Sequence, residues 1–102
     1  MGDERIATGL IIHRGRLDAP WGPARLAELA PEHLQALAAD PPEVLLIGTG
    51  RVTAFPPAAM LEWLSLNRIG FECMDSRSAA RTYNILIAEG RDVAIAMLPP
   101  GA

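Results

Sequence analysis

The sequence has no lysine and a single cysteine, and each scarcity excludes a class of chemistry. All nine positive charges among the 102 residues are arginines. Schiff-base catalysis and the lysine-containing phosphate loop are therefore excluded. Because Cys73 is the only cysteine, the chain forms no intrachain disulfide and no four-cysteine zinc site. The two histidines, His13 and His33, have no acidic or cysteine partner at metal-ligand spacing, so we expect no metal and no cofactor.

Positive charge is not in excess, and long apolar runs are missing. The formal net charge of −3 argues against a nucleic-acid-binding protein. The longest apolar stretches, residues 44–47 and 93–98, are far too short to cross roughly 30 Å of hydrocarbon. The polar, acidic start does not match a secretory signal. We therefore expect a soluble, cytoplasmic protein without stable membrane insertion, and the arginine- and alanine-rich composition is typical of bacteria.

What the sequence does contain is enough apolar surface for one hydrophobic core. Half of the residues are hydrophobic, and the length corresponds to one domain rather than two. The chain has no internal repeat, no low-complexity tract and no linker long enough to divide it. We therefore treat residues 1–102 as a single domain.

The apolar pattern predicts alternating strands and helices. Strands are predicted at residues 6–12, 16–21, 44–47, 71–74 and 93–98, and helices at about 31–39, 57–69 and 78–88. In the second half, strand–helix–strand–helix–strand order with right-handed crossovers puts helices on both faces of a mainly parallel sheet. We predict a three-layer α/β fold with a mixed, mostly parallel sheet. The N-terminal hairpin is expected at one edge or on one face of this sheet.

The first candidate site follows the buried strand at residues 44–47. Gly48-Thr49-Gly50-Arg51 lies where open α/β sheets bind ligands, beyond the carboxyl ends of the strands. The glycines expose backbone N–H groups, Thr49 adds a hydroxyl, and the Arg51 guanidinium suits a carboxylate or phosphate. The alternative is a tight loop with a surface arginine, because the third glycine of a dinucleotide fingerprint is missing.

The second candidate site is Asp75-Ser76-Arg77, after the next strand. If the two strands are parallel neighbours, this turn shares a rim with Gly48 and Arg51 and completes a cleft. Asp75 is a candidate base and Ser76 a candidate hydrogen-bond donor. The alternative is that Asp75 and Ser76 only cap the following helix.

The third candidate group is Arg81-Thr82-Tyr83-Asn84, of which Thr82, Tyr83 and Asn84 are the candidate site residues. Mid-helix Thr and Asn have modest helix propensity, so another constraint is expected to place them there. Either the group contacts a substrate or ligand, or Tyr83 and Asn84 satisfy buried backbone groups of an adjacent loop. Cys73 is interpreted as a small packed hydrophobe rather than a nucleophile.

Five segments carry a resemblance to a known family. They are, in order, residues 45–50 (LLIGTG), 55–57 (FPP), 74–75 (MD), 81–86 (RTYNIL) and 88–93 (AEGRDV). Together they resemble domain-of-unknown-function family 498, the Mth938-like family, over about residues 8–100. Trp21 and the Pro31-Glu32 helix start resemble its first half.

The resemblance implies a three-layer α/β fold with a mixed central sheet and a small extra β layer. It also implies a single domain without established enzymatic activity. A mitochondrial branch of this family acts as a binding partner during assembly of respiratory complex I. Where many relatives carry Thr-Gly-Ala-Ala-Cys after the Met-Asp pair, this chain has residues 76–80 (SRSAA), so Ala80 excludes thiol chemistry there.

Two functions follow from these observations. The first is a non-catalytic protein-interaction or assembly-factor-like domain with an unknown protein partner, which exposes an apolar patch including Trp21, Trp63 or Phe55. The second is a small anionic-ligand-binding protein or enzyme that uses the cleft beside Gly48 and Asp75. Homo-oligomerisation is compatible with either function.

Overall fold

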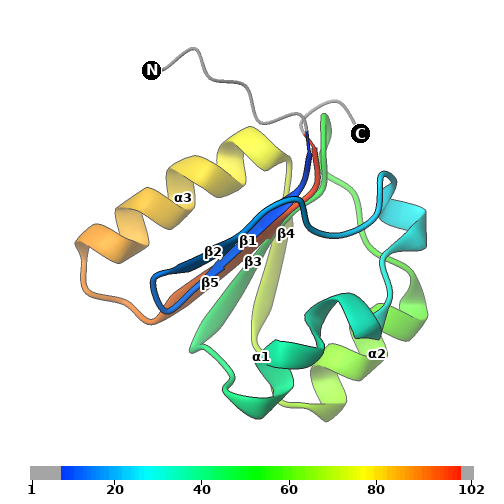
Figure 1. Ribbon diagram of the computed structural model, residues 1–102, viewed down its shortest axis with the longest axis horizontal. Helices are drawn as coiled ribbons and strands as arrows, with labels where there is room; N and C mark the ends of the chain where they lie inside the picture. The colour runs from blue at the N-terminus through cyan, green and yellow to red at the C-terminus, as the bar shows by residue number, and fades with distance from the viewer. Residues whose placement is uncertain (1–7, 100–102) are drawn as a thin grey trace.

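A five-stranded mixed sheet forms the centre of the protein (Figure 1). The computed structural model describes residues 8–99. Its strands are β1 (Leu10–His13), β2 (Arg16–Asp18), β3 (Val44–Gly48), β4 (Phe71–Met74) and β5 (Val93–Met97), in the spatial order β2-β1-β5-β3-β4. β3 pairs in parallel with β4 and β5, whereas β1 pairs antiparallel with β2 and β5. The predicted mixed α/β sheet is confirmed, and its parallel part comprises the three strands of the second half.

Helices cover both faces of the sheet (Figure 1). Alternate residues of β3 point to opposite sides. Leu45 and Ile47 enter one core cluster, and Leu46 enters the other. α3 (Ser76–Ala88) packs on the Leu46 side. The opposite face is covered by η1 (Leu26–Glu28), η2 (Pro31–Leu34), α1 (Gln35–Ala39) and α2 (Ala58–Leu66). The predicted helix–sheet–helix layering is therefore confirmed.

The N-terminal hairpin extends the main sheet. Its two-residue turn, Arg14-Gly15, has φ values of 52° and 78°. Two positive φ angles are typical of a type I′ turn, which suits the twist of paired strands. Ile11 pairs with Asp18 on one side and Ala96 on the other, so the ladder is continuous. The hairpin thus lies at the sheet edge, which confirms one of its two predicted positions, whereas the separate β layer that the resemblance implied is wrong.

Several predicted boundaries shift for local reasons. The first strand begins at Leu10, and the earliest predicted residues, 6 and 7, lie outside the described range. The second strand ends at Asp18, two residues before Pro20, which has no backbone N–H to donate to a ladder. The helix at residues 31–39 consists of η2 followed by α1, with Pro31 at its start. α2 ends at Leu66, because Arg68 has a φ of 57° that does not continue a helix.

α3 begins at Ser76, two residues earlier than predicted, and one stripe of its side chains faces the sheet. Ala79, Tyr83 and Leu86 pack into the cluster beneath the helix. Ile87, the residue after Leu86, is 47% exposed. A helix turns 100° per residue, so Ile87 lies beyond the edge of a face that already contains Leu86.

Candidate functional site

The two predicted turns meet at one rim of the sheet, where β3 and β4 end. Gly48 pairs with Met74 in the parallel ladder. Beyond it, the Thr49 amide donates to the Met74 carbonyl at 2.8 Å, and the Ser76 amide donates to the Gly50 carbonyl at 2.9 Å. The prediction that these turns lie side by side is confirmed. Their role in binding a ligand stays a prediction.

The hydroxyl of Ser76 is buried at the centre of this rim. It accepts a hydrogen bond from the Gly50 amide at 2.9 Å and donates one to the Leu98 carbonyl at 3.0 Å. Its residue is only 1% exposed. A Cβ on Gly48 would lie 3.1 Å from the Ser76 Cα, so glycine permits this close approach. Ser76 therefore joins three chain segments and has no free hydrogen to offer a ligand.

Asp75 caps α3, as its alternative interpretation predicted. Its carboxylate accepts from the Ser78 amide at 2.9 Å and from the Ser78 hydroxyl at 2.7 Å. These hydrogen bonds, with a smaller contribution from the charge of Arg81, hold the pKa of the Asp75 carboxyl below its usual value. The carboxylate that was considered as a base is thus stabilised in its charged form.

The loop after Gly50 is held to the rim by two threonine hydroxyls. The Thr49 hydroxyl donates to the Val52 carbonyl at 2.6 Å and accepts from the Ala54 amide at 3.2 Å. The Thr53 hydroxyl accepts from the Asp75 amide at 3.2 Å. The same loop exposes two large apolar side chains, Val52 at 63% and Phe55 at 73%. These contacts hold residues 52–54 to the rim. We name residues 51–55 the apolar loop.

Two arginines flank the rim. Arg51 follows Gly50, Arg77 follows Ser76, and both are exposed. Because Gly50 and Ser76 are hydrogen-bonded to each other, the arginine side chains that follow them are attached to neighbouring backbone segments. Within residues 8–99 neither one forms an ion pair or a hydrogen bond. Among the described residues, both guanidiniums are therefore without a partner and are accessible to a ligand.

Thr82, Tyr83 and Asn84 lie away from the rim. They are six to eight residues along α3 from Ser76, which is roughly 9–12 Å of helix rise. Tyr83 packs against the core cluster that contains Leu46 and Ile95. Asn84 is exposed, and in the described part of the chain neither Tyr83 nor Asn84 makes a side-chain hydrogen bond. The interpretation that these two satisfy loop backbone groups is therefore wrong.

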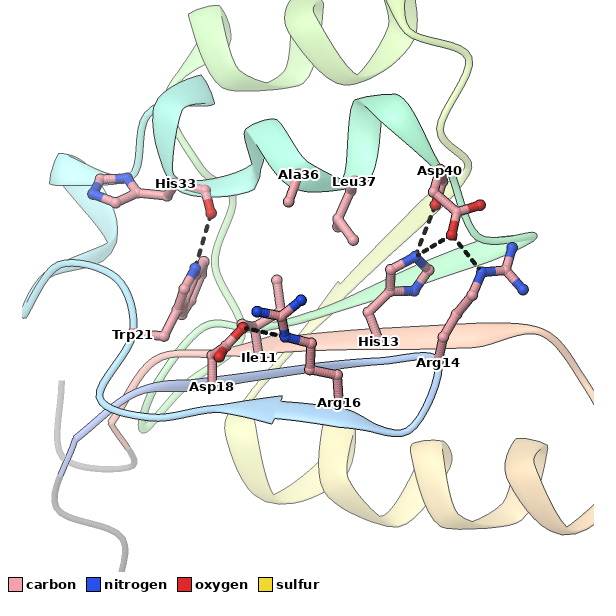
Figure 2. A pocket seen from close by; sticks show the side chains of 10 residues that line it. All are labelled: Ile11, His13, Arg14, Arg16, Asp18, Trp21, His33, Ala36, Leu37 and Asp40. Atoms are coloured by element: carbon pink, nitrogen blue, oxygen red, sulfur yellow. Dashed lines mark hydrogen bonds and ion pairs between the residues drawn. The ribbon is translucent and has the colours of Figure 1, made fainter.

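A pocket that the sequence did not indicate lies at the β2 edge of the sheet (Figure 2). Its volume is about 420 Å³. The hairpin register places Ile11 opposite Asp18 and His13 opposite Arg16, so all four side chains share one face. Residues 36–40 of the helical layer lie across from them.

Hydrogen bonds tie the two sides of the pocket together at both ends. The Trp21 indole N–H donates to the His33 carbonyl at 2.8 Å. At the other end, His13 Nε2 donates to the Asp40 carbonyl at 2.8 Å. His13 Nδ1 is buried and has no hydrogen-bond partner among the described residues. The spacing of His13, Arg16 and Asp18 around a tight turn is a sequence signal that their side chains share one face of the hairpin. No local signal shows that residues 36–40 lie across from them.

Comparison with known proteins reveals the family. Residues 1–98 match the profile of a family described as "Protein of unknown function (DUF498/DUF598)". The chain belongs to this family. The resemblance drawn from the five sequence segments is thereby confirmed.

Three relatives cover different shares of the DUF498 chain. An uncharacterised protein of Rhodobacter capsulatus is 40% identical over 95 residues, which is 92% of this chain and 72% of that protein. The "13 kDa major membrane protein" of Francisella tularensis is 30% identical over 87 residues, 85% of this chain and 66% of the relative. NADH dehydrogenase [ubiquinone] 1 alpha subcomplex assembly factor 3 of Danio rerio is 42% identical over 60 residues, but these are 59% of this chain and 34% of the factor.

Solved structures agree with the DUF498 fold. A protein of Xanthomonas campestris superposes with a TM-score of 0.79 at 39% identity, covering 92% of this chain and 71% of its own. A Bordetella pertussis protein described as a Mth938-like domain gives a TM-score of 0.74 at 34% identity, with 92% and 75% covered. The Mth938-like architecture is therefore the fold of this chain.

Other features of this DUF498 member concern metals, membranes and the cysteine. Residues 8–99 contain no cluster of three or more His, Cys, Asp or Glu side chains arranged to hold a metal. No helix in that range has the length and apolar character needed to span a bilayer.

Cys73 is half-buried against the core, and burial raises the pKa of its thiol. Its surroundings therefore favour the unreactive protonated thiol.

Proposed function

We propose that this chain is a non-catalytic, cytoplasmic protein-interaction domain of the assembly-factor type, and that the apolar loop is its docking element. The observation that carries the proposal is the exposure of Phe55 on a loop with a fixed backbone. Kinship with a protein named as an assembly factor supports the same role.

An exposed phenylalanine on an ordered loop is suited to binding. Burying such a side chain contributes about 1.5–3 kcal/mol. Flexible loops lose part of this gain because binding must order them. Here the Thr49 and Thr53 hydroxyls already hold the loop, so little ordering cost remains. Phe55 and Val52 therefore act as preformed anchors for a complementary apolar surface.

The tryptophans are poorer anchors than Phe55. Trp21 and Trp63 are partly buried and pack against the core cluster on the α1–α2 face. Of the three aromatic residues expected in an exposed patch, Phe55 is the one that is exposed. Its neighbours Arg51 and Arg77 favour a partner whose apolar pocket has an acidic rim.

Site-specific crosslinking tests this proposal. A photoreactive phenylalanine analogue at position 55 is expected to capture one protein in native cells, whereas the same analogue at Ile85, which is 58% exposed on α3, is not. The captured protein is then purified, and its affinity for the intact chain is measured.

Substitution of the two crosslinking positions gives the decisive comparison. Phe55→Ser is expected to weaken the purified complex at least tenfold, and Ile85→Ser to leave it unchanged, with both variants melting near the wild type. A complex that tolerates Phe55→Ser would overturn the proposal. Crosslinking from position 55 only to further copies of this chain would also overturn it, in favour of homo-oligomerisation.

The second candidate function is the binding of a small anion at the rim. Its support is the pair of exposed guanidiniums, Arg51 and Arg77, on neighbouring turns. The hydrogen-bonding groups of Gly50, Asp75 and Ser76 are engaged within the protein. Binding of an anion would therefore depend on the two arginine side chains. The Thr49 hydroxyl would not contribute, because it already donates to the Val52 carbonyl in the loop.

A further inference from the structure

The pocket at the β2 edge is a cavity separate from the rim. β2 and β4 are the two opposite edges of the sheet, so the pocket and the apolar loop occupy different ends of the strand order. The hydrogen bonds from Trp21 to His33 and from His13 to Asp40 hold both ends of the pocket. A volume of about 420 Å³ lies within the range of small-molecule sites.

Apolar side chains line only part of the pocket, between polar and charged side chains of the hairpin and the helical layer. Ile11 and Leu37 belong to the buried core and are 9% and 1% exposed. The Trp21 N–H is already bonded to the His33 carbonyl, so the indole offers a ligand only its ring. This lining favours a flat apolar body, because aromatic surfaces gain most from such contacts.

The two arginines of the hairpin differ in how far their charge is compensated. Arg14 donates to Asp40 at 2.9 Å and to Asp92 at 3.2 Å. Arg16 meets Asp18 at 3.9 Å, which is too long for a hydrogen bond, and its side chain is 81% exposed. Figure 2 shows Arg16 and Asp18 rising from β2 beside Ile11. The guanidinium of Arg16 therefore keeps N–H groups that can donate hydrogen bonds to a ligand at the entrance of the pocket.

We propose that this pocket binds a small aromatic carboxylic acid. The ring lies against the Trp21 indole ring, above the buried side chains of Ile11 and Leu37, and the carboxylate accepts two hydrogen bonds from Arg16. A planar guanidinium matches a carboxylate in this paired geometry. A doubly charged phosphate fits less well, because Asp18 and Asp40 also line the pocket and repel a dianion.

The test uses phenylacetate, its neutral analogue phenylacetamide and the cationic phenethylamine as probes. Titrations are followed by two-dimensional ¹H–¹⁵N NMR on the full chain. Phenylacetate is expected to shift the amide signals of β1 and β2 and the indole signal of Trp21, and to bind more tightly than either other probe.

Three variants separate the roles of charge and shape. Arg16→Gln is expected to weaken phenylacetate about five- to tenfold, the low end for a charge-assisted hydrogen bond exposed to water, and to leave phenylacetamide unchanged. Arg81→Gln, on α3 at the other face of the sheet, is the matched control and should leave both affinities unchanged. Ala36→Phe, at an exposed position lining the pocket, is expected to block both probes.

Several results would overturn the inference. They are the absence of any shift at millimolar phenylacetate, shifts confined to Arg51 and Arg77, preferential binding of phenethylamine, or unchanged phenylacetate affinity in Arg16→Gln. The spectrum of each variant reports directly whether it is folded. Phe55 does not line this pocket. A failure of the ligand proposal can therefore be distinguished from a failure of the docking proposal.

Discussion

The hydroxyl of Ser76 donates a hydrogen bond to the carbonyl oxygen of Leu98 at 3.0 Å, across 22 residues of sequence. The same hydroxyl accepts from the Gly50 amide at 2.9 Å. One buried side chain at the start of α3 thus holds the segments that follow β3 and β5. The rim keeps its shape because its polar groups bond to one another.

Replacing this hydroxyl is expected to destabilise the whole fold. Ser76→Ala leaves the Gly50 amide and the Leu98 carbonyl buried without this partner. An unsatisfied buried group costs about 1–3 kcal/mol, so we expect a loss of about 2–4 kcal/mol in the free energy of unfolding. Urea denaturation measures it. Ser65→Ala, at an exposed position of α2, should change the value by less than about 0.5 kcal/mol.

The close approach of β3 to α3 predicts a second sensitive position. A Cβ on Gly48 would lie 2.6 Å from Met97 Cγ and 3.1 Å from Ser76 Cα. Gly48→Ala is therefore expected to cost about 1–3 kcal/mol through overpacking. In Gly70→Ala the new Cβ would lie 3.4 Å from the Glu43 carbonyl oxygen, at the tight end of ordinary contact. Thermal melts should show a clear drop for the first variant alone, and equal drops would contradict this account.

The cap of α3 predicts an acid-dependent stability. Because the folded-state pKa of Asp75 is lowered, its charged form stabilises the protein at pH values above the ordinary carboxyl pKa. That contribution is lost as the pH falls below the ordinary carboxyl pKa and through the lower folded-state pKa of Asp75. Asp75→Asn lacks this charge but keeps a capping side chain. The stability difference between wild type and variant should be present at pH 7 and shrink towards pH 2.5 in urea titrations.

The apolar loop is expected to loosen without the Thr49 hydroxyl. Thr49→Val keeps the shape of the side chain but removes its bonds to Val52 and Ala54. We expect a loss of about 1–2 kcal/mol and faster amide hydrogen exchange at residues 52–54. Since Thr49 is 4% exposed, any weaker binding of the partner would reflect loop order and not direct contact. Thr82→Val on α3 serves as the control and should leave exchange in the loop unchanged.

The anion hypothesis for the rim has its own test. If phosphate binds between Arg51 and Arg77, phosphate should raise the melting temperature of the wild type. Arg51→Ala should abolish that increase, and Arg25→Ala, at an exposed position before η1, should retain it. A melting temperature that phosphate does not change in the wild type would exclude the hypothesis.

Local patterns were sufficient where one physical cause dominates. The run Val-Leu-Leu-Ile at residues 44–47 predicted β3, because both of its faces are buried and no polar side chain interrupts it. Asp75 predicted the start of α3 within two residues, since a carboxylate accepts from the free amides of a first helical turn. The order of strands and helices then implied that the turns after β3 and β4 share a rim.

The roles of the same residues were harder to predict. Gly50, Asp75 and Ser76 are suited both to ligand binding and to holding turns together, and residue type does not separate these uses. Only the distances from Ser76 Oγ to the Gly50 amide and the Leu98 carbonyl show that the Ser76 hydroxyl forms its hydrogen bonds within the protein. The same applies to Tyr83, because only the structure shows that it is partly buried and packs against the core cluster.

By itself, the sequence determined the family, the α/β class and the succession of elements, because each depends on residues close together in the chain. The tertiary structure decided that the hairpin extends the sheet through the pairing of Ile11 with Ala96. It also decided that Phe55 is exposed and that residues 36–40 lie across from the hairpin around a pocket. These features arise from contacts between distant segments, whose register and packing no local pattern encodes.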